Sequence, residues 1–286
     1  MKKNFIGILL LLLTVSLSAG AQQLTFQSAA DMQQYFTFTP GKKIISGHRG
    51  TRENGLPENS IPALKAVLKK TPAIFEVDPR YTKDSVAVMI HDATLDRTTT
   101  GKGKVADYSW KELRKLRLKN AAGEVTNYKI NTLDELIKWA KGKTILNLDK
   151  KDIPPAKIAE IIRKHQAYPW VWVTVHSLEE AAFHLAQHPD QYLSMHLRTI
   201  EAVQQFIHSG LPFNRMIVYI GPEIKVSNQS LYQELNSRGV LCMISASSSY
   251  DKLGTKELRQ EKFKQIFADG ASILETDFPM EAAEVL

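Results

Sequence analysis

Short apolar runs alternate with amphipathic segments along most of this chain, and that alternation limits its possible folds more than any other feature. Strand-like runs that are apolar throughout are typical of a parallel sheet covered on both faces. Eight strand–helix units close a TIM-type barrel of about 250 residues, and the chain has 286 residues. The sequence therefore predicts an α/β protein with a TIM-type (β/α)8 barrel. The nine expected strands are 43–47, 73–78, 86–90, 144–149, 170–175, 191–196, 215–220, 240–245 and 271–275.

One of these nine strands is surplus to a barrel of eight, so we expect a somewhat irregular barrel. No helix is expected between residues 78 and 86. The third expected strand is followed by a long segment at about 92–128, rich in Gly, Thr, Lys and Asp, with one short helix. We interpret it as an insertion beside the barrel mouth, where functional loops lie. The expected helices are 60–70, 109–117, 132–141, 155–166, 178–188, 199–209, 228–238 and 256–268.

The N-terminus has the pattern of a secretory signal peptide. Two lysines precede an apolar run at 5–15, and small residues follow up to Ala21. The run is shorter than the roughly 20 residues that a membrane span needs, and the single cysteine, Cys242, is too distant to carry a lipid there. We therefore expect a signal peptide at 1–21 and one barrel domain at 22–286. The protein would be exported, periplasmic or secreted, without a stable membrane anchor.

The formal net charge is +7, from 37 Lys and Arg against 30 Asp and Glu. A modest positive field suits a small anionic substrate such as a phosphodiester. The basic residues are scattered and do not alternate with aromatic residues, so nothing indicates a nucleic-acid surface.

Carboxylates stand at the carboxyl ends of two expected strands. Glu76 and Asp78 are two residues apart, so both side chains point to one side, and Asp149 ends another strand. The carboxyl ends of barrel strands meet at one face, where three carboxylates would repel each other unless a cation neutralised them. Oxygen ligands suit a hard divalent cation, so we expect one Mg²⁺ or Ca²⁺.

Two histidines and two cationic side chains end strands on the same expected face. His48 and His91 can give or take a proton near neutral pH, one as base and the other as acid. Arg49 and Lys151 can hold phosphate oxygens. With a divalent cation, this set is suited to in-line phosphoryl transfer.

Several motifs occur in an order and spacing that resemble the glycerophosphodiester phosphodiesterase family, within the PI-PLC-like phosphodiesterases. Residues 44–103 carry the most specific part of the resemblance, and later motifs extend it over most of the chain. The motifs are His48-Arg49-Gly50, Pro57-Glu58-Asn59-Ser60, Glu76-Val77-Asp78, Thr82-Lys83-Asp84, His91-Asp92, Leu95-Asp96-Arg97-Thr98-Thr99, Ile130–Leu136, Asn147–Lys151 and Thr276-Asp277-Phe278-Pro279.

The resemblance implies a role for each candidate residue. His48 and His91 would be the acid–base pair, and Glu76 and Asp78 would bind the metal. Asp149 would be the third metal ligand, at a position where the family usually has Glu.

Three more residues would face the substrate. Arg49 and Lys151 would bind the phosphate, and Glu58 would lie at the mouth of the site. A loop role for Glu58 and Asn59, capping the following helix, is equally open. The strand at 240–245 lacks the Trp-Thr-Val-Asn-like motif of the family, whose Trp helps to wall the substrate pocket, so the resemblance does not determine which substrate is bound.

The resemblance implies metal-dependent hydrolysis of glycerophosphodiesters to glycerol phosphate and an alcohol. Two alternatives stay open: a phosphodiesterase for glycerophosphoinositol or intact phospholipid headgroups, and a non-catalytic binding protein on the same barrel. The sequence leaves open the headgroup, the choice of cation, the oligomeric state, which histidine is the acid, and whether a cyclic phosphate forms. His176, His196 and Arg198 also lie near strand ends, and we interpret them as ordinary polar groups.

Overall fold

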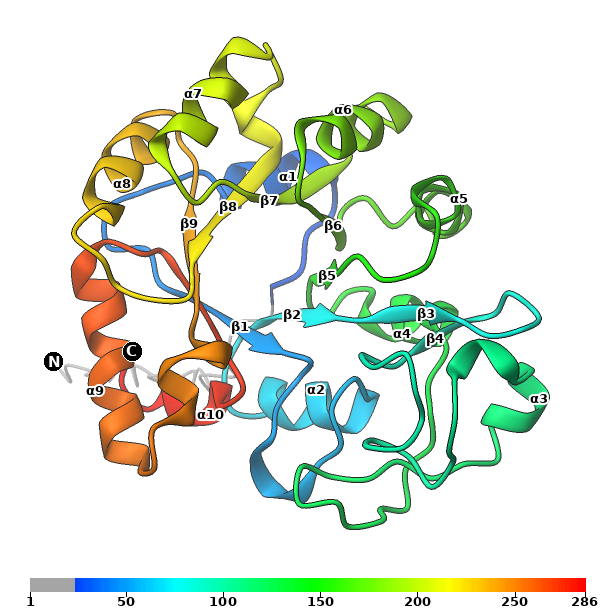
Figure 1. Ribbon diagram of the computed structural model, residues 1–286. Helices are drawn as coiled ribbons and strands as arrows, with labels where there is room; N and C mark the ends of the chain where they lie inside the picture. Colours follow the sequence, from blue (N-terminus) through cyan, green and yellow to red (C-terminus); the bar gives the residue numbers. More distant parts are fainter. Residues whose placement is uncertain (1–23) are drawn as a thin grey trace, which may run out of the picture.

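The computed structural model describes residues 24–286, and eight parallel strands in it close a barrel (Figure 1). The expected TIM-type fold is therefore confirmed. The signal peptide predicted at 1–21 lies outside the described residues and stays a prediction. In barrel order the strands are β1 (Ile44–His48), β2 (Ile74–Val77), β5 (Leu146–Leu148), β6 (Val171–Val175), β7 (Tyr192–His196), β8 (Met216–Gly221), β9 (Cys242–Ser245) and β10 (Ile273–Thr276).

Helices surround the barrel and cover its outer face (Figure 1). Several begin at a side-chain N-cap. Ser60 accepts a hydrogen bond from Ala63 N at the start of α2, and Thr132 forms a capping box with Glu135 in α4. Within residues 24–286, no helix is long and apolar enough to cross a membrane. The helices are α2 (Ile61–Leu68), α4 (Leu133–Ala140), α5 (Pro155–His165), α6 (Leu178–Gln187), α7 (Ile200–His208), α8 (Asn228–Ser237), α9 (Lys256–Asp269) and α10 (Pro279–Ala283).

The third expected strand, 86–90, is not a barrel strand. It contains β4 (Ala87–Met89), which pairs antiparallel with β3 (Pro79–Tyr81) in a two-stranded ribbon outside the barrel. The turn between them is closed by Thr82 N donating to Val86 O at 3.0 Å. Such a short link reverses the chain, whereas a parallel neighbour needs a long crossover. This ribbon accounts for the surplus strand.

The segment after β4 folds on a small core of its own beside the barrel (Figure 1). It contains η2 (Val105–Asp107) and α3 (Trp110–Leu113). Val88 of β4 belongs to this core, so the segment packs against the ribbon that follows β2. The buried residues of this core are Val88, Ile90, Leu95, Val105, Leu113, Leu118 and Ile130.

The amino-terminal end of the barrel is covered by α1 (Ala29–Tyr35), for which the sequence predicted no helix. Ser28 and Asp31 form its capping box. Phe36, directly after the helix, is buried and packs edge-to-face on Trp172 at a centroid distance of 4.5 Å. Aromatic side chains therefore fill this end, and the opposite end is free to carry polar groups.

Candidate active site

The three predicted metal ligands lie together at the carboxyl end of the barrel. Glu76 and Asp78 come from the end of β2, and Asp149 follows β5, the neighbouring strand. Asp149 N donates to Val77 O at 2.9 Å, which fixes the two strand ends side by side. One oxygen from each carboxylate lies within 4.8 Å of the others. Parallel pairing of β2 with β5 thus produces the acidic cluster that the sequence predicted.

Two cations partly neutralise this cluster. Lys151 Nζ lies 2.9 Å from Asp78 Oδ1 and also contacts Asp149, and Arg49 Nε lies 3.5 Å from Asp78 Oδ2. Burial opposes ionisation of Asp78, but the charges of Lys151 and Arg49 outweigh it and hold its pKa below the usual range. Asp149 likewise has a lowered pKa, because contacts with His176 and Lys151 outweigh its burial.

The acidic cluster fits a divalent cation. Burial, and then the charge of Asp78, raise the pKa of Glu76 well above its usual value. Among residues 24–286, Asp78 Oδ1 has no partner in hydrogen-bond geometry, although Lys151 lies beside it. Buried carboxylates of this kind prefer a hard cation with oxygen ligands. A bound cation would act in the opposite direction and favour the ionised form of Glu76.

Arg49 is held in place by a tight turn after β1. Its own φ is 55° and that of Gly50 is 95°, both in the left-handed region. A Cβ on Gly47 would lie 2.4 Å from Gly50 O, so the turn requires glycine there. Arg49 N donates to Glu76 O at 3.0 Å and also lies 3.2 Å from Glu76 Oε2. The turn therefore positions Arg49 and one metal-ligand candidate together.

Each predicted catalytic histidine is paired with a carboxylate through Nδ1. His48 Nδ1 lies 2.7 Å from Asp277 Oδ1, and His91 Nδ1 lies 2.8 Å from Asp92 Oδ1. A carboxylate at Nδ1 fixes the ring and leaves Nε2 for proton transfer. The Nε2 of His48 points to the acidic cluster, 3.8 Å from Glu76 Oε2. Burial acts to lower the pKa of His48, but Asp277 and Glu275 outweigh it, so the pKa lies above its ordinary value.

His91 reaches the site by a route that differs from the prediction. It follows β4 of the ribbon and does not end a parallel barrel strand. Ile90 N donates to Asp78 O at 2.9 Å, so the hairpin returns the chain to the end of β2. The ribbon therefore delivers His91 to the acidic cluster.

Glu58 contacts two arginines and does not cap a helix. Arg97 donates to both Glu58 oxygens, at 2.7 and 2.9 Å, and Arg49 Nη1 donates to Oε1 at 3.2 Å. Arg97 also donates to both oxygens of Asp92, at 2.7 and 2.9 Å. Glu58 thus links the turn that carries Arg49 to the segment that carries the partner of His91.

Asn59 has a role that the sequence did not indicate. Its Nδ2 donates to Asp78 Oδ2 at 2.6 Å, and its Oδ1 accepts from Asp78 N at 2.9 Å. Its φ of 55° lies in the left-handed region, which Asn tolerates better than most residues. The helix cap expected of Glu58 and Asn59 is supplied by Ser60. Asn59 therefore orients a metal-ligand candidate.

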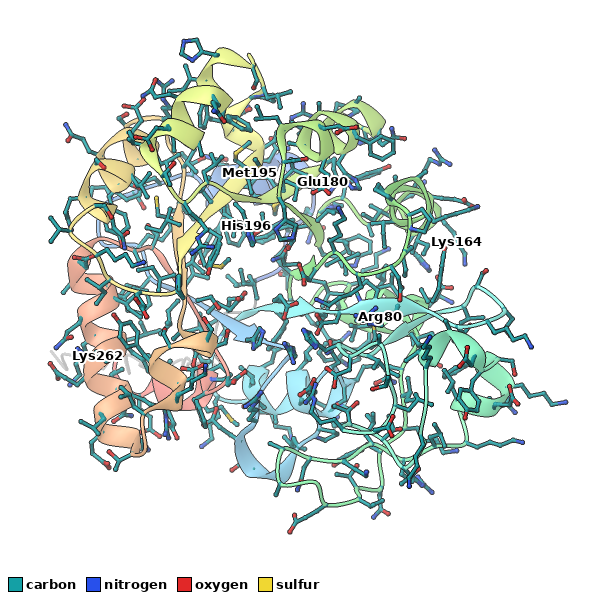
Figure 2. The ribbon with its side chains drawn as sticks, in the orientation of Figure 1. Arg80, Lys164, Glu180, Met195, His196 and Lys262 are labelled. Atoms are coloured by element: carbon teal, nitrogen blue, oxygen red, sulfur yellow. The ribbon has the colours of Figure 1, made fainter. Side chains whose placement is uncertain are left out.

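A polar cavity of about 160 Å³ opens beside the acidic cluster. His48, Glu76 and Asp149 are among the residues that line it. His196, which Figure 2 labels in the barrel interior, also lines it. The other lining residues are Asn147, Thr174, Ser194, Tyr219, Met243, Ser245, Ser247, Ser248 and Glu275.

His196 and its neighbour His176 take more part in the site than the sequence indicated. The two Nδ1 atoms are 3.1 Å apart, and His176 Nε2 lies 3.7 Å from Asp149 Oδ1. Burial, and then the charge of His176, lower the pKa of His196 to about 4, so it is neutral near pH 7.

Asp277 and Glu275 were not singled out as site residues. Both belong to the last strand or its carboxyl end, the position that marked the other candidates. A place at the carboxyl end of a barrel strand was therefore the signal that could have identified Glu275 and Asp277.

Residues 48–171 match the model of the Glycerophosphoryl diester phosphodiesterase family. A solved structure of a glycerophosphoryl diester phosphodiesterase from Parabacteroides distasonis is 44% identical, with a TM-score of 0.90. That match covers 92% of this chain and 93% of the other. A phosphodiesterase from Oleispira antarctica, solved in complex with the product sn-glycerol-3-phosphate, is 17% identical with a TM-score of 0.63. It covers 85% of this chain and 96% of its own, and shares the fold.

Another relative matches the chain over a shorter region. A glycerophosphodiester phosphodiesterase from Caldanaerobacter subterraneus subsp. tengcongensis is 38% identical over 106 residues, which is 37% of this chain and 43% of that protein. The matched region thus spans less than half of that relative's length.

Proposed function

The chain belongs to the glycerophosphodiester phosphodiesterase family of phosphoric diester hydrolases, and on that premise we propose that it hydrolyses glycerophosphodiesters to glycerol phosphate and an alcohol. The observation that carries the proposal is the grouping of one acidic triad with two histidine–carboxylate pairs at one barrel mouth. The Oleispira phosphodiesterase, solved with sn-glycerol-3-phosphate, supports glycerol phosphate as the product.

Each group of this chain has a distinct part in the proposed reaction. Glu76, Asp78 and Asp149 would hold one Mg²⁺ or Ca²⁺, which supplies Lewis-acid stabilisation of phosphate charge when bound. Arg49 and Lys151 lie beside the same carboxylates and would bind the phosphate oxygens.

The two histidines would move the protons of the reaction. His48 and His91 each hold Nε2 free of the carboxylate partner, so one can accept a proton while the other donates one to the leaving oxygen. Asp277 and Asp92 keep the imidazoles oriented and stabilise their protonated forms.

We place this reaction outside the cytoplasm. The basic, apolar and small-residue pattern at 1–21 supports export to the periplasm or the medium, with cleavage near Ala21. Cys242 is buried and free, which is compatible with an oxidising compartment because it leaves no exposed thiol.

Two alternatives are less well supported. An intact phospholipid would need an apolar surface at the mouth, whereas hydroxyls, histidines and carboxylates line the cavity. A binding protein without turnover would have no need of a carboxylate behind each histidine, and both pairs are in place at 2.7 and 2.8 Å.

The deciding experiment is hydrolysis of a glycerophosphodiester panel by the mature protein. The panel contains the glycerol, choline, ethanolamine and inositol diesters, each assayed after EDTA and then with Mg²⁺ or Ca²⁺ restored. We expect glycerol phosphate to be released only with the cation. Turnover that EDTA leaves intact would exclude the metal-dependent reaction, and a cation-loaded protein inactive on every diester would exclude the proposed function.

A further inference from the structure

One wall of the cavity carries a carboxyl group that the proposed reaction does not use. Glu275 stands in β10 two residues before Asp277, so both side chains point to the same side of the strand. It is 6% exposed, and Ser46 Oγ on the paired strand donates to its Oε2 at 3.1 Å. A buried carboxyl facing a cavity retains oxygen atoms that a ligand can reach.

A second observation concerns Ser194 on the floor of the same cavity. Its side chain is fully buried, and among residues 24–286 its Oγ has no hydrogen-bond partner. Buried hydroxyls normally have a partner, so each exception needs an explanation. Because Ser194 and Tyr219 both line the cavity, a hydroxyl-bearing ligand there would supply that partner.

The cavity lies on one side of the catalytic groups. His48 borders it, whereas His91 does not. The side chain of His91 is also more exposed than that of His48, at 34% against 15%. A phosphodiester held between the two histidines would thus place one substituent in the cavity and leave the other toward solvent.

The size and chemistry of the cavity select the first substituent. At about 160 Å³ it is smaller than the roughly 300–1,000 Å³ pockets that hold drug-sized ligands. A quaternary ammonium group would favour an aromatic cage, but among the lining residues of the described chain Tyr219 is the one phenol, with no Trp or Phe. The hydroxyls that line the cavity both donate and accept hydrogen bonds, and so do the hydroxyls of a small polyol.

We propose that Glu275, with Ser194 and Tyr219, binds the hydroxyls of a glycerol substituent in this cavity and is the specificity-determining residue, while the second alcohol stays outside. This inference rests on the proposed function. It assigns the small polyol to the His48 side and predicts tolerance of varied alcohols on the His91 side. Burial raises the pKa of Glu275 above its ordinary value.

Two synthetic esters with the same leaving group test this assignment. Glycerol 4-nitrophenyl phosphate and propyl 4-nitrophenyl phosphate have equal carbon chains and differ by two hydroxyls. A site that hydrogen-bonds substrate hydroxyls rejects an analogue that lacks them, so we expect kcat/KM to favour the glycerol ester by about 100-fold or more. Release of nitrophenolate with Mg²⁺ or Ca²⁺ present measures both rates.

The variants Glu275→Leu and Glu275→Gln separate recognition from folding. We expect Glu275→Leu to lose most of the preference for the glycerol ester. Loss of the Glu275 charge also lowers the pKa of His48, which changes the rates on both esters alike and leaves their ratio as the readout. Remaining cation-dependent hydrolysis of the propyl ester shows that the variant is folded. Glu275→Gln should keep a larger part of the preference, because an amide also donates and accepts. Glu281→Gln, a carboxyl paired with Arg259 outside the cavity, should leave the ratio unchanged.

Three results would overturn the inference. If the parent protein hydrolyses both esters equally, the cavity does not recognise the substrate hydroxyls, although the phosphodiesterase function stands. If Glu275→Leu keeps the full preference, a residue other than Glu275 recognises the glycerol hydroxyls. If the cation-loaded protein cleaves neither ester nor any natural glycerophosphodiester, the proposed function itself fails and the inference with it.

Discussion

At the scale of single residues, the two histidines are alike in their Nδ1 partners and different in their surroundings. His48 is paired with Asp277 next to the cavity, and His91 is paired with Asp92 nearer to solvent. The pairing fixes which nitrogen can exchange a proton with substrate. Removing either imidazole should therefore affect chemistry and leave the acidic triad intact.

We expect His48→Ala and His91→Ala each to lower kcat by about 10²–10⁴-fold, the usual contribution of a positioned acid or base. Cation affinity, measured by isothermal titration, should change little because neither histidine belongs to the acidic triad. His208→Ala, an exposed histidine at the end of α7, is the matched control and should have the parent kcat. Normal turnover in both active-site variants would show that the histidine assignment is wrong.

The partner of His48 should be visible in the pH profile. Asp277 helps to raise the pKa of His48, so Asp277→Asn should lower that pKa. The limb of the kcat/KM profile that reports His48 then moves to lower pH. We expect kcat to fall by about tenfold or more, because the Asn amide can donate to Nδ1 and favour the wrong imidazole tautomer. Rates measured from pH 5 to 9 check both effects. A profile that stays in place would mean that His48 does not titrate in the observed range.

Residue types were easier to predict than residue partners. Carboxylates at strand ends and the histidines stood out because periodicity and motif spacing place them. Glu58 and Arg97 are 39 residues apart in the chain, and their bidentate contact depends on how the inserted segment folds back over the barrel. Local spacing carries no information on such a contact, so the link between Arg49, Glu58 and Arg97 could not be derived from it.

At the scale of elements, a buried apolar run was mistaken for a barrel strand. Residues 86–90 are apolar throughout because Val88 and Ile90 are buried in the core of the inserted segment, and they resemble the mostly apolar barrel strands. Burial determines composition and does not reveal which sheet a strand joins. The missing helix between residues 78 and 86 was the better indicator, since a parallel pair requires a crossover.

Helix α1 was missed because residues 22–42 carry no regular apolar period. It closes the barrel through two buried side chains, Met32 and Phe36. Trp172 and Tyr192, which fill that end of the barrel, both pack against Phe36. The helix therefore contributes to stability at the end opposite the active site.

We expect Phe36→Ala to destabilise the fold by about 3–5 kcal/mol, the usual cost of truncating a buried Phe. Because Phe36 lies at the opposite end from the acidic triad, kcat of the folded variant should equal that of the parent. Denaturant unfolding and steady-state rates below the transition measure the two quantities. Gln34→Ala, an exposed residue of α1, should change neither. A loss of kcat without loss of stability would contradict the structural role given to α1.

At the scale of the whole molecule, the site exists only when the barrel closes. Its residues run from His48 in the first strand to Asp277 after the last, and β1 pairs with β10 to bring them together. Closure also concentrates negative charge, because Glu76, Asp78 and Asp149 meet at one end. In the absence of a cation, burial and then this repulsion raise the pKa of Glu76.

A divalent cation should accordingly stabilise the whole fold. A ligand at 100 times its Kd stabilises by about 2.7 kcal/mol, which for a domain of this size raises Tm by roughly 5–10 °C. Glu76→Gln should abolish most of this shift while leaving the cation-free Tm equal or higher, since one repelling carboxylate is removed. Because the cation binds the ionised form of Glu76, whose pKa is raised in the cation's absence, the Tm shift should grow as pH rises. Calorimetric scans with EDTA, Mg²⁺ or Ca²⁺ at several pH values measure it, and a Tm that responds to neither cation would exclude the triad as a metal site.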